Sequence, residues 1–153
     1  MTDISLRPIH DDRDCLASFP VMRELRPHLA DAASFIARIR RQQAQGYHLL
    51  AAWRGDEVMA LAGWRVQENL LYGRFLYIDD LVTAAAARGH GLGARLIDAL
   101  REEARRQDCA QLVLDTALAN ALGQRFYFRQ GLLAQGLHFR QPLAAATSTE
   151  VSP

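Results

Sequence analysis

The stretch from Phe75 to Ala94, FLYIDDLVTAAAARGHGLGA, joins an apolar run, a turn of small residues and a glycine-spaced loop. Phe75 to Val82 is rich in the aromatic and aliphatic residues that favour strands, and only the adjacent Asp79 and Asp80 interrupt it. The loop, Arg88 to Gly93, leads at once into a run with helical apolar spacing. A strand, glycine loop and helix in this order predict an anion site, because glycines expose main-chain N–H groups and a helix N-terminus is partially positive.

Three strand-like runs precede that loop in the sequence: Tyr47 to Trp53, Val58 to Val66 and Arg74 to Thr83. The first two are separated by Gly55-Asp56, a pair of turn formers that favours a hairpin. Because the links are short, successive runs should pair with their neighbours in sequence. The sequence therefore predicts an antiparallel meander before the loop.

The N-terminal part is predicted to be one short strand followed by two helices. Ile4 to Ile9 alternates apolar and polar residues and reads as an edge strand. The helical pattern that follows predicts a first helix that ends near Phe19, before Pro20, or near Leu25. A second helix is expected to start at the cap candidate Asp31.

The part after the loop helix carries one more helix and further strand material. Gln111 to Asp115 is predicted to be a buried strand, and Asn120 to Gln130 a helix closed by Gly131. Leu133 to Leu143 is expected to supply the final strand material. We therefore predict one domain over residues 1–143 and a disordered tail over residues 144–153.

Composition excludes several classes of protein. All 18 cationic residues of the 153-residue chain are arginine, so lysine Schiff bases and lysine-containing phosphate loops are excluded. A formal charge of +1 provides no concentrated basic field, so no nucleic-acid partner is expected. No signal peptide or membrane-spanning run is recognised, so we expect a cytoplasmic protein without a membrane partner. The five histidines and two cysteines have no ligand spacing, so no metal site is predicted.

The glycine loop is compatible with more than one ligand. Gly89 to Ala94 matches G-x-G-x-x-A, the dinucleotide fingerprint, and Asp108 or Asp115 stands at a tolerable distance for a ribose contact. A dinucleotide fold, however, places this loop after its first strand, whereas about three strands precede it here. A third interpretation is a glycine turn that only packs a helix against a sheet. Arg88 could add a bidentate contact to a phosphate, or stay a solvated cation.

Two stretches of the sequence match motifs that occur together in one family. Arg88, Gly91 and Gly93 of the loop fit [QR]-x-x-G-x-[GA]. Downstream, N-x-x-[AG]-x-x-[FL]-Y-x-x-x-G is matched by Asn120, Gly123, Phe126, Tyr127 and Gly131. With both motifs in this order, the sequence resembles the GNAT superfamily of acyl-CoA-dependent N-acetyltransferases. Gly123 stands where the family more often has alanine. The resemblance implies an α/β fold with a mixed, mostly antiparallel sheet of about six or seven strands, flanked by about four helices.

The resemblance also implies acetyl-CoA as the cosubstrate. Its pyrophosphate would lie on main-chain N–H groups of the loop, and its pantetheine arm along the unpaired backbone of Leu81 and Val82. The loop residues implied are Arg88, Gly89, His90, Gly91, Leu92, Gly93 and Ala94. Asn120 would bond the cofactor arm, or it would only cap the helix that it begins.

For catalysis, the resemblance implies direct attack of an amine on the thioester. Tyr127 matches the family's general acid, although it could be a core aromatic. Of the acidic pair Asp79 and Asp80 we favour Asp79 as the base, acting through water; only one of the two can face the site unless a bulge intervenes. Alternatively, the pair forms salt bridges with arginines from the N-terminal helices. An acidic site floor would favour a cationic acceptor.

We therefore predict an N-acetyltransferase acting on a small amine, amino acid or peptide. The alternatives are a non-catalytic acyl-CoA-binding module or regulator and, more distantly, a nucleotide-cofactor oxidoreductase. A homodimer formed through sheet edges or the ends of the last strands is compatible with this interpretation. No motif identifies the acceptor.

Overall fold

The computed structural model describes residues 3–144, in two compact units with their boundary between Leu114 and Asp115. The first unit holds a sheet and three α-helices, and the second holds one α-helix and an extended segment. The proposed domain end at residue 143 stays a prediction. Residues 145–153, most of the expected disordered tail, lie outside the described part.

The first unit is built on a five-stranded sheet in the order β1-β2-β3-β4-β5. The strands are β1 (Ile4–Pro8), β2 (His48–Arg54), β3 (Glu57–Asn69), β4 (Gly73–Thr83) and β5 (Gln111–Leu114). β1 to β4 pair antiparallel in sequence order, and β5 joins β4 in parallel. This confirms the meander, the hairpin after β2, the edge position of β1 and the mixed, mostly antiparallel sheet.

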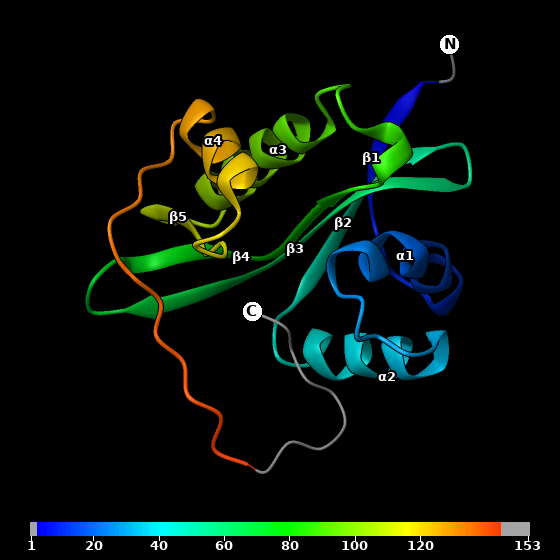
Figure 1. Ribbon diagram of the computed structural model, residues 1–153, viewed down its shortest axis with the longest axis horizontal. Coiled ribbons are helices and arrows are strands. Elements are labelled where there is room, and N and C mark those ends of the chain that lie inside the picture. The colour runs from blue at the N-terminus through cyan, green and yellow to red at the C-terminus, as the bar shows by residue number, and fades with distance from the viewer. Residues whose placement is uncertain (1–2, 145–153) are drawn as a thin grey trace. The chain divides into compact units, whose positions relative to one another are not determined.

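Three helices cover the two faces of this sheet. α1 (Asp12–Leu25) and α2 (Ala32–Gln43) lie on one face and α3 (Leu92–Arg106) on the other (Figure 1). Of the two predicted ends for the first helix, the structure has the later one, because the helix continues through Pro20. The Asp31 cap is confirmed: its carboxylate accepts a hydrogen bond from the Ser34 N–H.

Each face of the sheet has its own apolar core. Phe35, Tyr47 and Leu61 belong to the core under α1 and α2, whereas Leu76 and Leu96 belong to the core under α3. Side chains alternate between faces along a strand, so membership of a core reports the face to which a residue points.

The second unit contains α4 (Ala121–Arg129), which confirms the predicted helix. The strand predicted over Leu133 to Leu143 is wrong: these residues carry no strand, and Leu133, Leu137, Phe139 and Leu143 are exposed. Apolar content suggested a strand, but Gly136 and Pro142 weaken one, and a strand also needs a neighbour for its backbone groups. Within residues 3–144 the sheet has five strands rather than six or seven, with four α-helices as predicted.

None of the helices within residues 3–144 is long and apolar enough to cross a membrane.

Candidate active site

The loop between β4 and α3 is shaped by two glycines in left-handed conformation. After a 3-10 turn, Ala85–Ala87, the chain passes through Gly89 (φ 82°) and Gly91 (φ 75°). Such φ values are unfavourable for residues with a Cβ, which explains glycine at both positions. Gly91 is the N-cap residue of α3, so the loop ends directly on the helix N-terminus.

The loop presents a run of main-chain donors. Within residues 3–144, none of the N–H groups from Gly89 to Ala94 has a hydrogen-bond acceptor; the first bond of α3 runs from the Arg95 N–H to the Gly91 carbonyl. The exposed Arg88 guanidinium also has no partner in this part of the chain. His90 is exposed too, but its Nδ1 lies 3.0 Å from the Arg88 carbonyl oxygen, so the ring folds back onto the loop. The glycine loop therefore has the donors that an oligophosphate requires.

One side of β4 is open just before this loop. β5 pairs with β4 only from Phe75 to Ile78, so within the first unit the end of β4 from Asp80 to Thr83 forms strand pairs only with β3. The Ala84 N–H bonds to the Met59 carbonyl, and hydrogen-bonding direction alternates along an antiparallel strand. Leu81 therefore points its N–H and C=O toward the open side, whereas those of Val82 point toward β3. Of the two residues expected to offer unpaired groups, only Leu81 does so.

The acidic pair lies at a β-bulge. Asp80 pairs with Gly63 and Ile78 with Trp64, so Asp79 is an extra residue without a partner on β3. Before the bulge Ile78 faces the α3 core; after it Leu81 faces that core and Val82 the opposite one. This change of register places both carboxylates on the face of α1 and α2. The bulge on which the prediction for the pair depended is present.

Asp80 is held by groups from two other elements. Arg26, at the end of α1, donates to its Oδ1 from Nε (3.0 Å) and Nη2 (2.9 Å). Tyr47, just before β2, donates its hydroxyl to Oδ2 (2.8 Å). Burial, followed by the Asp80 charge, raises the pKa of Tyr47 well above its ordinary value, so this hydroxyl keeps its proton. Both oxygens of Asp80 are therefore engaged.

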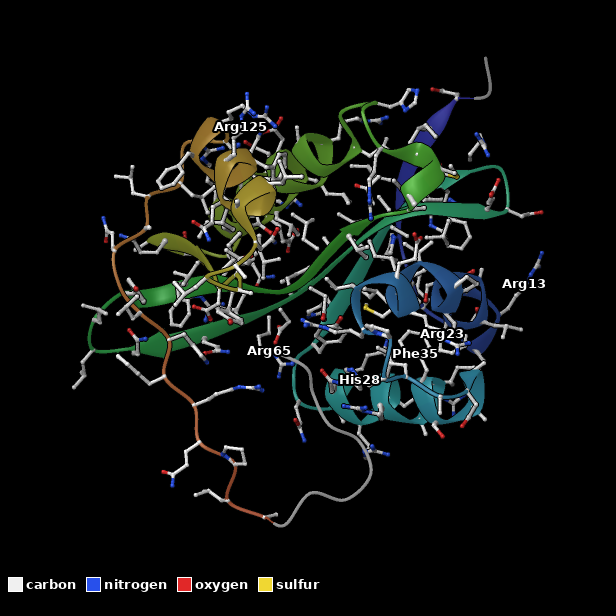
Figure 2. All side chains as sticks on the ribbon, viewed as in Figure 1. Arg13, Arg23, His28, Phe35, Arg65 and Arg125 are labelled. Carbon is white, nitrogen blue, oxygen red and sulfur yellow. The ribbon has the colours of Figure 1, made fainter. Side chains whose placement is uncertain are left out.

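Asp79 is less fully engaged. Its Oδ2 accepts a hydrogen bond from Arg65 Nε at 2.9 Å, and within residues 3–144 its Oδ1 accepts none. Arg65 also donates to Gln42 of α2 and lies over the Tyr47 ring, on the face of α1 and α2 (Figure 2). Burial raises the pKa of Asp79, and Arg65 opposes that shift. A raised pKa makes Asp79 a better proton acceptor than an ordinary aspartate.

The salt bridges considered as an alternative are thus present, although their arginines lie outside the N-terminal helices: Arg26 is the C-cap residue of α1, and Arg65 belongs to β3. Two carboxylates and two guanidinium groups balance in charge. The floor around the pair is therefore neutral rather than acidic, and it gives no preference for a cationic acceptor.

Four residues of this cluster were not predicted: Arg26, Tyr47, Gly63 and Arg65. Only Gly63 could have been recognised from the sequence, because a glycine within a strand often marks a β-bulge or a place where another group approaches the backbone closely. A Cβ at Gly63 would lie 1.9 Å from the Tyr47 hydroxyl oxygen. Gly63 therefore provides the space through which Tyr47 reaches Asp80.

In the second unit, Asn120 caps α4. Its Oδ1 accepts from the Gly123 N–H (3.1 Å) and its Nδ2 donates to Thr116 Oγ1 (2.9 Å). A Cβ at Gly123 would lie 2.3 Å from Asn120 Nδ2, so the cap in the conformation seen here leaves room only for glycine at this position. The capping role is confirmed, and the cofactor contact of Asn120 stays a prediction.

Tyr127 is half-buried on α4, and burial raises its pKa. Its hydroxyl is therefore protonated at neutral pH, as a proton donor requires. Its neighbour Phe126 packs edge-on against it, whereas Phe128 is exposed. The three consecutive aromatic residues thus do not share one side of the helix.

The fold is that of an α/β protein in which a glycine loop with a run of exposed main-chain donors follows the fourth strand of a meander. The chain belongs to the acetyltransferase (GNAT) family, whose sequence model matches residues 9–132. A meander before the loop is also not the parallel arrangement of a dinucleotide fold, so the dinucleotide interpretation loses its support.

Relatives of known sequence and structure agree with this assignment. The chain is 29% identical to the uncharacterized N-acetyltransferase YhdJ of Bacillus subtilis (strain 168), covering 92% of this chain and 99% of that protein. It resembles the acetyltransferase structure from Trypanosoma brucei (TM-score 0.78, 21% identity, 92% and 100% coverage). It also resembles the aminoglycoside N-acetyltransferase AAC(6')-Iy in complex with CoA (TM-score 0.82, 13% identity, 94% and 97% coverage).

Proposed function

We propose that this protein is an N-acetyltransferase that transfers an acetyl group from acetyl-CoA to an amine by direct attack. The observation that carries the proposal is the run of six main-chain N–H groups from Gly89 to Ala94 at the N-terminus of α3, which find no acceptor among residues 3–144, beside an Arg88 that has no partner there either. Such a run suits the pyrophosphate of a CoA ester. A solved relative whose fold is similar was obtained with CoA, which supports the choice.

The residues of the site divide the work of the reaction. Loop N–H groups and Arg88 would hold the pyrophosphate, and the N–H and C=O of Leu81, which point away from β3, would bond the pantetheine amides as a missing strand would. The amine nitrogen attacks the thioester carbonyl carbon, and the C–S bond breaks. Asp79 would take the amine proton through a water molecule, and Tyr127 would give its proton to the leaving thiolate.

The acceptor class is an amine, and nothing on the neutral floor beside Asp79 narrows it further. The structural relative AAC(6')-Iy is named an aminoglycoside N-acetyltransferase. Aminoglycosides therefore belong in an acceptor panel together with small amines, amino acids and peptides.

Thermal unfolding with ligands tests the cosubstrate. A ligand present at a hundred times its Kd stabilises the folded state by about 2.7 kcal/mol. Acetyl-CoA and CoA are expected to raise Tm, and NADH is not. A rise with NADH and none with CoA would support the oxidoreductase alternative and overturn the proposal.

Thiol release from acetyl-CoA, measured across the amine panel, tests the transfer. An acceptor-dependent signal is expected, and Tyr127→Phe should reduce it by about 10²- to 10⁴-fold because the proton donor is lost. The matched control is Tyr72→Phe, which removes a hydroxyl from the β3–β4 turn. Stabilisation by CoA without thiol release for any amine would instead indicate the non-catalytic acyl-CoA-binding alternative.

A further inference from the structure

The cluster around the bulge treats its two carboxylates differently. Asp80 is 15% exposed and receives three hydrogen bonds, two from Arg26 and one from Tyr47. Asp79 is 24% exposed and receives one hydrogen bond from the part of the chain that the structure describes, donated by Arg65. Because a base needs an accessible lone pair, Asp79 is the better placed of the two to act on a substrate proton.

Arg26 forms hydrogen bonds with both residues of the acidic pair at the bulge. Its Nη2 donates both to Asp80 Oδ1 (2.9 Å) and to the main-chain carbonyl oxygen of Asp79 (3.0 Å). A bulged residue has lost its ladder partner, so its backbone depends on other groups for orientation. One guanidinium thus fixes the peptide that carries the Asp79 side chain, and Asp80 fixes that guanidinium in turn.

Tyr47 closes the arrangement from the opposite side. Its hydroxyl donates to the second oxygen of Asp80, and its ring supports the Arg65 guanidinium, with Arg65 Cζ 5.4 Å from the ring centroid. Arg65 is the residue that binds the Asp79 carboxylate. Tyr47 therefore contacts both the anchor of the bulge and the partner of Asp79.

From these contacts we propose that Arg26, Asp80 and Tyr47 form a positioning bracket, which holds the β4 bulge so that the Asp79 carboxylate is aimed at the acceptor. Asp80 is then a positioning residue and not the base. The catalytic part of this inference rests on the proposed acetyltransferase function, whereas the effect of the bracket on the bulge can be measured without any acceptor.

The pKa of the Asp79 carboxyl depends on the charged and titratable groups that face it. They are Arg65 from β3, Arg26 from the end of α1, Asp80 from β4 itself and Tyr47 from the start of β2. The Asp80 charge raises the pKa of Asp79. Neutralising Asp80 should therefore lower that pKa and move the acid limb of the pH–rate profile to lower pH.

The test compares Asp80→Asn with Asp12→Asn. Asp12 also accepts two hydrogen bonds from one guanidinium, from Nε and Nη2 of Arg40, but it lies on the exposed surface of α1 and α2. Asp80→Asn is expected to lower kcat by about 10- to 100-fold through misplacement of Asp79, with the KM for acetyl-CoA unchanged. Its acid limb should move to lower pH. Asp12→Asn should change neither kcat nor the profile.

Two outcomes would overturn the bracket. Complete loss of the acid limb in Asp80→Asn would make Asp80 the base. A rate and profile like those of Asp12→Asn would show that Asp80 positions nothing. If Asp80→Asn does not fold, Tyr47→Phe provides the test, since it keeps the aromatic ring and the salt bridge between Arg26 and Asp80. The kcat of Tyr47→Phe is expected to drop by about 2- to 10-fold. An unchanged kcat would contradict the proposal.

NMR of the free protein separates this inference from the function. The amide signals of Asp79 and Ile78 should shift in Asp80→Asn and Tyr47→Phe, and the Asp79 carboxyl carbon should titrate at lower pH in Asp80→Asn. Unmoved signals would refute the bracket even in an active enzyme. A wild type that releases no thiol would refute the proposed function, while these signals would still decide the bracket.

Discussion

The glycine loop and the carboxylate cluster lie only a few residues apart in sequence, yet they are built in opposite ways. The loop uses the main chain of six consecutive residues, Gly89 to Ala94, and requires a particular residue type only at the left-handed Gly89 and Gly91. The cluster uses side chains brought together from 14 to 54 positions away, such as Arg65 on Asp79 and Arg26 on Asp80. A local motif can therefore describe the first site and cannot describe the second.

The two sites should also fail differently. A main-chain site depends on backbone conformation, so a substitution that changes φ should weaken ligand binding. The cluster depends on charges and hydrogen bonds that orient one carboxylate, so its variants should affect the rate and leave acetyl-CoA binding intact. Variants in each site, scored by both measurements, test this separation.

The largest effect is expected for Asp79→Asn, which removes the proposed proton acceptor and keeps the shape of the side chain. The acetyl-transfer rate should fall by about 10²- to 10⁴-fold. Burial raises the pKa of Asp79, so the wild-type rate should fall as pH drops through that raised pKa, and the variant should lose this limb. Thiol release measured against pH checks both statements.

The stabilisation of Asp79→Asn by CoA should equal that of the wild type, since the loop is untouched. A variant that lost CoA binding as well would show that the two sites are coupled. A variant that kept the wild-type rate and pH profile would remove Asp79 from the reaction.

Sequence predicted most of the fold because its signals are local. Gly55 at the β2–β3 turn, the Asp31 cap and the apolar spacing of α3 each act over a few residues, and all three predictions are confirmed. The segment after α4 was mispredicted because a strand is defined by its neighbour, and apolar residues such as Leu133 do not supply one.

In the candidate site, too, the features with local sequence signals were predicted and those that depend on distant residues were not. The two loop glycines were recognised from their spacing, because left-handed φ values require glycine there. Arginine partners for the acidic pair were considered, but neither Arg26 nor Arg65 was identified and Tyr47 was missed, because nothing local in the sequence links these residues to Asp79 or Asp80. Even the bulge, which decides where both carboxylates point, depends on a register between β3 and β4 that only the folded sheet fixes.

The next largest effect concerns the space beneath the cluster. Gly63→Ala places a Cβ 1.9 Å from the Tyr47 hydroxyl oxygen and 2.6 Å from Tyr47 Cζ. The Tyr47 side chain is buried, so it has little room to move away. Overpacking of this kind costs about 1–3 kcal/mol of unfolding free energy, and it should also push Tyr47 away from Asp80. Urea unfolding and thiol release should both record the change.

Gly136→Ala is the matched control, since a Cβ there meets no atom within 4 Å and the residue lacks a positive φ. It should leave the unfolding midpoint nearly unchanged. Equal midpoints for both variants would mean that Tyr47 moves aside without cost, and the fit between Gly63 and Tyr47 would lose its significance.

The smallest effect is expected for Gly91→Ala in the loop. A Cβ at Gly91 meets no atom within 4 Å, so the substitution acts only through the left-handed backbone, at a cost of about 1–2 kcal/mol. If the chain relaxes that strain by rotating away, the N–H groups turn from the ligand and acetyl-CoA should bind about 5- to 30-fold more weakly. Calorimetry measures the affinity directly.

Gly55→Ala separates backbone strain from binding, because Gly55 is also left-handed (φ 60°) and equally open but lies in the β2–β3 turn. Both variants should lose similar stability, and only Gly91→Ala should lose affinity. Equal affinities would mean that the loop keeps its conformation against the strain, so that the donors depend on the fold around them rather than on glycine. The loop would then be as much a product of tertiary structure as the cluster is.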